Sequence, residues 1–133
     1  MKVELENVKP MEIEQRSFEI ITAELKRELP EDTAPIIKRC IHTSADFDYA
    51  DNLCFSEHVV EKSLAALKAG ACIVTDTQMA KSGINKKALA KFGGEVYCFM
   101  SDEDVAQTAR ENGTTRATAS MDKAAALQKP LIF

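Results

Sequence analysis

Short apolar runs alternate with helix-like segments along the second half of this chain. The runs cover residues 71–74, 95–100 and 131–133 of 133. An unbroken apolar run is typical of a strand that helices cover on both faces, and strands that alternate with helices predict a parallel sheet. We therefore expect an α/β fold with three layers, α/β/α, and a mainly parallel sheet. The length favours a single domain over residues 1–133.

The first half of the chain shows helical periodicity instead. Apolar residues recur at helical spacing over residues 11–29, and Pro30 is expected to end this helix. A second helix is predicted over residues 33–43. The acidic stretch 44–51 is rich in turn formers and predicts a turn, and residues 52–55 are a candidate for a short strand.

Capping residues mark the later helices. Ser56 and Gly70 suit the start and the end of one helix, Ser101 suits the start of another, and Thr114 or Thr115 suits the start of a third. The predicted helices cover residues 56–69, 76–81, 85–92, 102–112 and 115–127.

Charge and hydropathy narrow the class of protein. The net charge is −4, and the first 32 residues hold nine acidic and five basic side chains, which argues against a general binder of nucleic acid or of membrane surfaces. No apolar run approaches the roughly 20 residues of a membrane span. The first residues are too polar for a signal peptide. We expect a soluble, cytoplasmic protein.

The four cysteines form no C-x-x-C pair that would suggest a zinc or redox site. Each lies among apolar neighbours, so we predict buried structural thiols. They are Cys40, Cys54, Cys72 and Cys98.

His42 is the first candidate for chemistry. It is one of two histidines, and it ends the predicted helix 33–43 beside Thr43. A cation is favoured at a helix C-terminus, and imidazole exchanges a proton near neutral pH, so His42 suits a general acid. The same position also fits a capping histidine, and the pattern leaves both readings open. His58, in the first turn of a later helix, is predicted to lie on the surface.

Three carboxylates follow His42 with the spacing D-x-D-x-x-D: Asp46, Asp48 and Asp51. A site for a hard metal ion needs more oxygen ligands and usually a glycine turn, so a hydrogen-bonded turn is favoured over a metal-binding module. No Walker loop, dinucleotide-binding fingerprint or esterase motif occurs. We predict no metal site.

Ligands of parallel sheets bind beyond the carboxyl ends of the strands. Thr75, Asp76 and Thr77 follow a predicted strand, so they are candidates either for capping the next helix or for binding a ligand. Arg116 falls in the first turn of a predicted helix, where a cation opposes the helix dipole, so it favours an anionic partner. Arg16 lies on the first helix and by pattern is a solvated charge.

One long segment, residues 39–53 (RCIHTSADFDYADNL), resembles the signature of the precorrin-8X methylmutase family. The version found here is more similar to the cobalt-precorrin-8 enzymes. The resemblance continues in register over nearly the whole chain, through residues 14–18 (EQRSF), 65–71 (AALKAGA), 74–77 (VTDT), 94–96 (GEV) and 113–117 (GTTRA).

This resemblance implies an isomerase of cobalamin biosynthesis that shifts a methyl group between adjacent carbons of ring C. The product would be hydrogenobyrinic or cobyrinic acid, and no cofactor is needed. The family's catalytic histidine corresponds to His42, its substrate-contacting serine to Ser17 and its arginine to Arg116. Arg16 and Thr43 adjoin these positions, and the 75–77 segment belongs to the same set of substrate-binding candidates.

The resemblance also implies a homo-oligomer, a dimer in the family, that binds a tetrapyrrole acid rather than nucleic acid or a membrane. Family members continue beyond the strand that starts at Leu131, so we expect the C-terminal part of the family domain to be absent. The alternative function is a non-catalytic tetrapyrrole-binding or assembly protein. The sequence leaves open whether the substrate carries cobalt.

Overall fold

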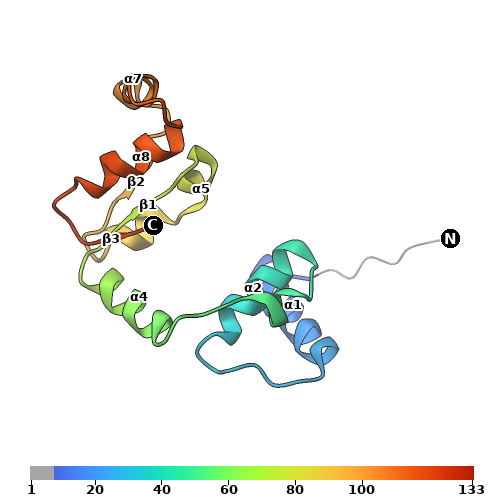
Figure 1. Ribbon diagram of the computed structural model, residues 1–133. Helices are drawn as coiled ribbons and strands as arrows, with labels where there is room; N and C mark the ends of the chain where they lie inside the picture. The colour runs from blue at the N-terminus through green and yellow to red at the C-terminus, as the bar shows by residue number, and fades with distance from the viewer. Residues whose placement is uncertain (1–7) are drawn as a thin grey trace. The chain divides into compact units, whose positions relative to one another are not determined.

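The computed structural model describes residues 8–133 and divides the chain into two compact units, Met1–Val60 and Glu61–Phe133 (Figure 1). Each unit has its own cluster of buried apolar side chains. The expectation of a single domain over residues 1–133 stays a prediction.

The first unit is built on two helices that pack against each other, α1 (Pro10–Leu25) and α2 (Ala34–Ser44). A proline at the first position suits α1, because the N–H that proline lacks has no helical partner there. The helix ends before the predicted Leu29, since Lys26 adopts a left-handed conformation with φ of 50°. Leu29 still packs on the core, from the connecting segment.

The core of this unit confirms the apolar faces predicted from helical spacing only in part, because Ile13 of α1 and Ile36 of α2, which share the spacing, are exposed. Ile21 of α1 meets Ile37 and Ile41 of α2, and Ile41 is only 1% exposed. The partly buried side chains packed around them are Phe18, Leu25, Leu29, Phe47, Ala50, Leu53 and Phe55.

The strand predicted over residues 52–55 is wrong. A short helix, α3 (Tyr49–Asn52), occupies its start, and the sheet of the described residues 8–133 contains no strand from this segment. Leu53 and Phe55 pack on the helical core instead. The short apolar run 53–55 therefore reflects packing on helices rather than pairing in a sheet.

Helix α4 (Val59–Lys68) begins later than the predicted Ser56, because His58 has a φ of 58° and lies outside helical geometry. The predicted left-handed glycine at the other end is confirmed. Gly70 has a φ of 87°, and an added Cβ there would lie 2.9 Å from the carbonyl oxygen of Phe92.

The second unit contains a three-stranded parallel sheet in the order β2-β1-β3. Its strands are β1 (Cys72–Val74), β2 (Val96–Tyr97) and β3 (Leu131–Ile132). Ile73 pairs with Val96 on one side and Ile132 on the other. The α/β class and the parallel direction are confirmed. The predicted burial of β1 on both faces is only partial, since Ile73 is half-buried while Cys72 and Val74 on either side of it are buried.

After α4, the second unit contains four further helices: α5 (Gln78–Gly83), α6 (Lys86–Ala90), α7 (Glu103–Glu111) and α8 (Arg116–Ala125). Helices α7 and α8 pack on each other around Val105, Ala109 and Ala119. Thr115 caps α8 by accepting a hydrogen bond from the backbone N–H of Thr118. The predicted cap Ser101 is wrong, because the residue before α7 is Asp102.

The cysteine prediction holds for two of the four thiols. Cys72 and Cys98 are buried, Cys40 is half-buried and Cys54 is exposed. Cys54 lies between Leu53 and Phe55, which both pack on the core of the first unit, so the intervening side chain faces solvent in this extended segment.

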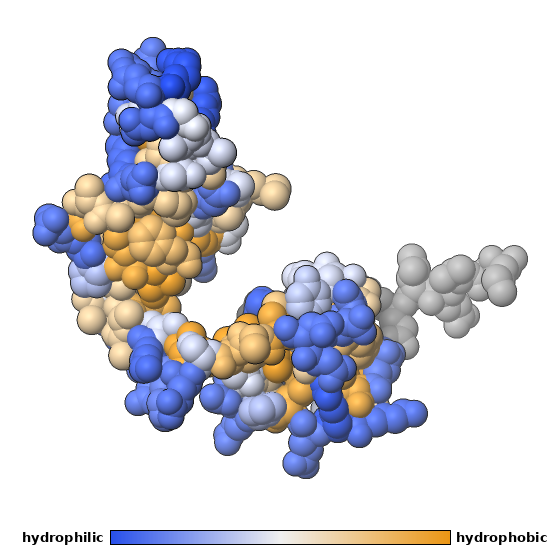
Figure 2. All heavy atoms as spheres, in the orientation of Figure 1, coloured by the Kyte–Doolittle hydropathy of each residue, from blue (hydrophilic) through white to orange (hydrophobic). Residues whose placement is uncertain are grey.

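Apolar side chains also reach the surface. Figure 2 shows them gathered on the visible face of the second unit, between polar regions. The large apolar residues of this unit that are exposed are Leu64, Met79, Phe92 and Phe133. Within residues 8–133, no helix combines the length and the apolar character that crossing a membrane requires.

Gly94→Ala is expected to lower the free energy of unfolding by about 1–3 kcal/mol, the usual effect of overpacking. The added Cβ would lie 2.5 Å from the carbonyl oxygen of Ala71, directly before β1, and 2.9 Å from Cδ1 of Leu89. Gly83→Ala is the matched control, because nothing lies within 4 Å of its added Cβ. Denaturant unfolding measures both variants, and equal midpoints would contradict the clash.

Two lysines pair with carboxylates beside β2 and α7. Lys129 Nζ lies 2.8 Å from Glu95 Oε2, and Lys123 Nζ lies 2.7 Å from Asp104 Oδ2. Lys129 and the Tyr97 hydroxyl hold the pKa of Glu95 below its ordinary 4.5. Lys123 holds the pKa of Asp104 below its ordinary 3.8.

A carboxylate whose pKa is lower in the folded state stabilises that state at higher pH and loses this contribution as the pH falls. The second unit should therefore become less stable as the pH drops below about 4.5 and then through the lowered pKa values. Glu95→Gln should flatten this dependence in unfolding measured from neutral to acidic pH. Glu111→Gln is the control, since Glu111 pairs with Gln107 rather than with a lysine. Equal flattening by both would contradict the assignment.

Candidate functional site

The side chain of His42 is held by a serine from the neighbouring helix. His42 lies in the last turn of α2, and its Nδ1 is 2.7 Å from the Oγ of Ser17 on α1. Ser17 is half-buried and His42 is exposed. The structure thus brings together the predicted acid and the predicted serine, which are 25 positions apart in the chain.

This geometry leaves one nitrogen of the imidazole available. Within residues 8–133, Nε2 of His42 has no hydrogen-bond or ion-pair partner. An imidazole with Nδ1 held and Nε2 free can transfer a proton at Nε2. The alternative of a capping histidine loses support, because the ring bonds Ser17 and the Cys40 carbonyl accepts from Thr43 and Ser44 instead.

An aromatic ring lies against the imidazole. The centroids of Phe18 and His42 are 6.2 Å apart at 76°, an edge-to-face arrangement. The guanidinium of Arg39 lies 5.9 Å from the centroid of Phe18 and forms an ion pair with Glu14. Four side chains thus surround one histidine, two directly and two through Phe18.

Thr43 is exposed, but its hydroxyl bonds its own helix. Its Oγ1 donates to the carbonyl oxygens of Arg39 and Cys40 at 3.1 and 3.0 Å. A role of Thr43 in substrate binding stays a prediction, and with its proton donated to the backbone this hydroxyl could still accept a hydrogen bond.

The acidic loop after α2 is a hydrogen-bonded turn. The backbone N–H of Asp48 donates to Oδ1 of Asp46 at 2.9 Å, while Asp51 pairs with Arg27 at 2.8 Å. Among the described residues, no group of three or more His, Cys, Asp or Glu side chains is arranged to hold a metal ion.

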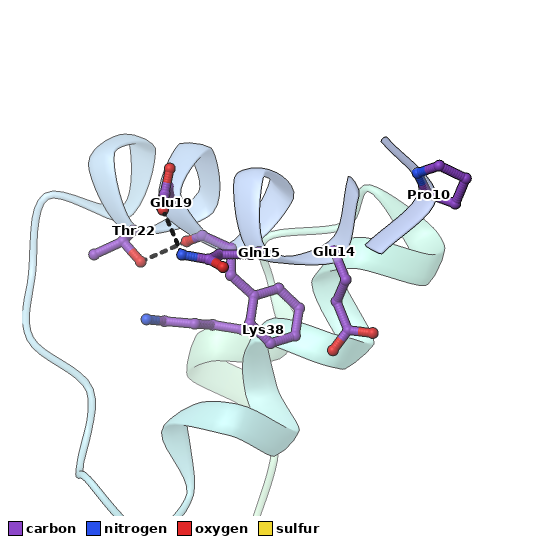
Figure 3. A pocket seen from close by; sticks show the side chains of 7 residues that line it. Pro10, Glu14, Gln15, Glu19, Thr22 and Lys38 are labelled. Carbon is purple, nitrogen blue, oxygen red and sulfur yellow. Dashed lines mark hydrogen bonds between the residues drawn. The ribbon is translucent and has the colours of Figure 1, made fainter. Parts of the chain in front are cut away.

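A pocket of the first unit lies along α1 and α2 beside this cluster (Figure 3). It has a volume of about 710 Å³ and includes Glu14, Phe18 and Lys38, but neither Ser17 nor His42. Arg16 is exposed and lines a second pocket on α1, of about 480 Å³, with Glu12 and Glu19. The predicted arginine is therefore near a hollow surface but shares it with carboxylates.

The predicted loops at the carboxyl ends of β1 and β2 meet in the second unit. The Gln78 amide, after β1, donates to the Ser101 hydroxyl, after β2, at 3.3 Å. Thr77 caps α5 by accepting from the N–H of Ala80. Thr75 is buried and donates to the carbonyl oxygen of Thr77 at 3.1 Å, while Asp76 is exposed.

The three residues after β1 thus divide between the two roles that the sequence left open. Thr75 and Thr77 shape and cap the turn, and Asp76 alone directs a carboxylate to solvent. Of the three, only Asp76 has an exposed carboxylate, while the two threonine hydroxyls could contact a ligand only with the hydrogen-bonding capacity that the turn leaves them.

Arg116 is the first residue of α8, directly after the Thr115 cap. Its side chain is exposed and has no hydrogen-bond or ion-pair partner among residues 8–133. Cations are disfavoured at this end of a helix. The position is compatible with an external anion, and the role of Arg116 in binding one stays a prediction.

Sequence reasoning missed Glu14, Phe18 and Arg39 as parts of the site. The signal was present in the spacing, because Glu14 and Phe18 are four apart on α1, and Arg39 and His42 are three apart on α2. Such pairs share a helix face. The sequence does not tell which face of one helix meets which face of the other, so the contacts of Arg39 with Glu14 and Phe18 could not be predicted from it.

Comparisons with known proteins give one consistent result. Residues 12–133 match the family model described as Precorrin-8X methylmutase. The cobalt-precorrin-8 methylmutase of Salmonella typhimurium is 46% identical over 123 residues, which are 88% of this chain and 59% of that protein. The corresponding protein of Priestia megaterium is 40% identical over 118 residues, 88% of this chain and 52% of that protein.

A solved structure agrees with the sequence matches. The precorrin-8X methylmutase from Thermus thermophilus superposes with a TM-score of 0.73 at 36% identity, covering 86% of this chain and 55% of that one. The chain spans about half the length of the relatives that it matches.

Proposed function

Because this chain belongs to the precorrin-8X methylmutase family, we propose that it acts in cobalamin biosynthesis as an isomerase of a precorrin-8. The proposed reaction moves a methyl group between adjacent carbons of ring C, giving hydrogenobyrinic or cobyrinic acid. The observation that carries the proposal is the His42 imidazole, whose Nδ1 is held by Ser17 while Nε2 has no partner within residues 8–133.

His42 is proposed as the proton donor. In the methyl shift one carbon–carbon bond breaks and another forms at the neighbouring carbon, so the reaction is an isomerisation without net oxidation. Electron demand must develop beside the migrating group, and a proton or hydrogen bond given to the conjugated ring produces it. Nε2 of His42 can supply this proton, and general acid catalysis of this kind contributes about 100- to 10,000-fold.

Ser17 is proposed to act mainly on His42. Its hydroxyl is already bonded to Nδ1 at 2.7 Å, so contact with substrate would have to use its remaining hydrogen-bonding capacity. A hydroxyl can donate to neutral Nδ1 and accept from protonated Nδ1. The bond can therefore persist while Nε2 gains or loses its proton.

The carboxylates of the substrate require cationic partners. Arg116 at the start of α8 is the strongest candidate, because a guanidinium binds a carboxylate with two hydrogen bonds and Arg116 has no partner among residues 8–133. Arg16 is a further candidate on α1. Asp76 and the hydroxyls of Thr43, Thr75 and Thr77 complete the proposed substrate-binding set.

The assembly and the location belong to the same proposal. The family resemblance supports a homo-oligomer, most simply a dimer, and a biosynthetic isomerase of this class suits the cytoplasm. Sedimentation of the purified chain tests the first statement. A single monomeric species at working concentration would contradict it.

Incubation of the chain with precorrin-8 and with cobalt-precorrin-8, followed by chromatography of the corrinoids, tests the activity. Conversion of either substrate is the expected result, and it also tells whether cobalt is required. Calorimetric titration with hydrogenobyrinic acid, against Mg²⁺ and Ca²⁺ as comparisons, tests binding separately. Binding without conversion would favour the non-catalytic tetrapyrrole-binding protein, and no binding would remove both functions.

A further inference from the structure

We propose that Glu14, Phe18 and Arg39 are positioning residues, which together with Ser17 fix the imidazole of His42 so that Nε2 is the nitrogen presented to a ligand. This inference deepens the proposed function and rests on it. The four residues are called the imidazole bracket below.

The first contact of the bracket fixes one ring nitrogen. Ser17 Oγ lies 2.7 Å from Nδ1 of His42, a distance typical of a hydrogen bond with good geometry. A half-turn of the ring about its last side-chain bond would place a carbon where Nδ1 now lies and would break this bond. The Ser17 contact therefore selects one of two ring orientations, the one in which Nε2 has no partner among residues 8–133.

The second contact restrains the plane of the ring. Phe18 meets the imidazole edge to face, with centroids 6.2 Å apart at 76°. Ser17 and Phe18 are consecutive residues of α1, so both contacts come from one turn of one helix. A movement of this turn would change the nitrogen contact and the ring contact together.

The remaining two residues hold Phe18. Arg39 places its guanidinium carbon 5.9 Å from the centroid of the Phe18 ring, within the range of a cation–π contact, and the same guanidinium pairs with Glu14. Glu14 stands one turn before Phe18 on α1, and Arg39 stands nearly one turn before His42 on α2. The ion pair thus joins the same two helix faces that hold the imidazole.

The exposure of the Glu14–Arg39 ion pair argues against a role in stability alone. Such pairs contribute little to stability, because solvent screens them. Both Arg39 and Glu14 are about half exposed, at 60% and 47% of their side chains, so a stabilising role alone would be weak. What distinguishes this pair is its contact with the ring that restrains His42.

The test is nuclear magnetic resonance of the imidazoles in the full 133-residue chain labelled with ¹⁵N-histidine. The chain has only two histidines, so His58 serves as an internal reference. Nitrogen shifts report which ring nitrogen carries the proton, and the ring protons of His42 report the ring current of Phe18. Neither signal depends on turnover.

Ser17→Ala should displace the ¹⁵N signal of Nδ1 of His42, because the hydrogen bond that this nitrogen makes with Ser17 is lost. Phe18→Leu should abolish the ring-current displacement, and Phe18→Tyr should restore it. Glu14→Gln and Arg39→Gln should each cause part of that loss, because Phe18 then lacks its support.

Two matched controls come from the same surface. Glu19→Gln removes a carboxylate of α1 that bonds Gln15 rather than Arg39, and Lys38→Gln removes the cation of α2 beside Arg39 (Figure 3). Both should leave the His42 signals unchanged. The positioning role is overturned if Glu14→Gln and Arg39→Gln shift these signals no more than the two controls do.

The outcomes separate this inference from the proposed function. Conversion of precorrin-8 together with unmoved His42 signals in the Glu14 and Arg39 variants would reject the bracket alone. Shifted signals in a chain that neither binds nor converts a corrinoid would reject the function and leave the positioning of His42 intact.

Discussion

His42→Asn is expected to lower the rate of the proposed methyl shift by about 100- to 10,000-fold, the range that general acid catalysis supplies. Asparagine keeps a polar side chain near Ser17 but has no proton to transfer near neutral pH. His42→Ala should behave alike. Single-turnover conversion of precorrin-8, with the corrinoids resolved by chromatography, measures the loss.

The fold should survive this change. His42 is exposed and lies at the end of α2, so the main structural loss is one hydrogen bond to Ser17, about 1 kcal/mol. His58→Asn is a matched control, since it removes the other histidine at a position with φ of 58°, which asparagine tolerates. Turnover by His42→Asn within tenfold of the unmodified chain would remove His42 from the role of acid.

The sequence predicted the α/β class because the apolar run 71–74 lies between helical segments, and this local pattern decides the layer arrangement. It predicted the core of the first unit for the same reason, since Ile21, Ile37 and Ile41 repeat at helical spacing. The strand at 52–55 failed because a short apolar run does not tell which kind of element covers its side chains. Leu53 and Phe55 are covered by helices.

Part of the candidate site could likewise be predicted from the sequence. The resemblance assigned His42 and Ser17 separately, and their bond at 2.7 Å joins them in one arrangement. The contribution of Arg39 and Glu14 depends on the docking of α1 on α2, which no local pattern encodes. An arginine three residues before a histidine on a helix indicates no function by itself, and it is the contact of Arg39 with Phe18 that links it to His42.

Arg116→Ala is expected to weaken binding of hydrogenobyrinic acid by about 10- to 100-fold, because a charge-assisted hydrogen bond contributes about 1.5–3 kcal/mol. The salt dependence of binding should fall as well, since one screened ionic contact is lost. Stability should stay the same or rise slightly, by about 0.3–1 kcal/mol, because the cation at the start of α8 opposes the helix dipole. Calorimetry at two salt concentrations and thermal unfolding measure these effects.

Arg110→Ala is the matched control for Arg116. It removes the same charge from an exposed arginine, but one in the last turn of α7, where the dipole favours a cation. It should therefore reduce stability slightly and leave affinity almost unchanged. Arg116→Lys keeps the charge and loses the planar fork, so it should recover only part of the affinity. Equal losses of affinity in Arg116→Ala and Arg110→Ala would trace the effect to net charge and return Arg116 to an ordinary surface residue.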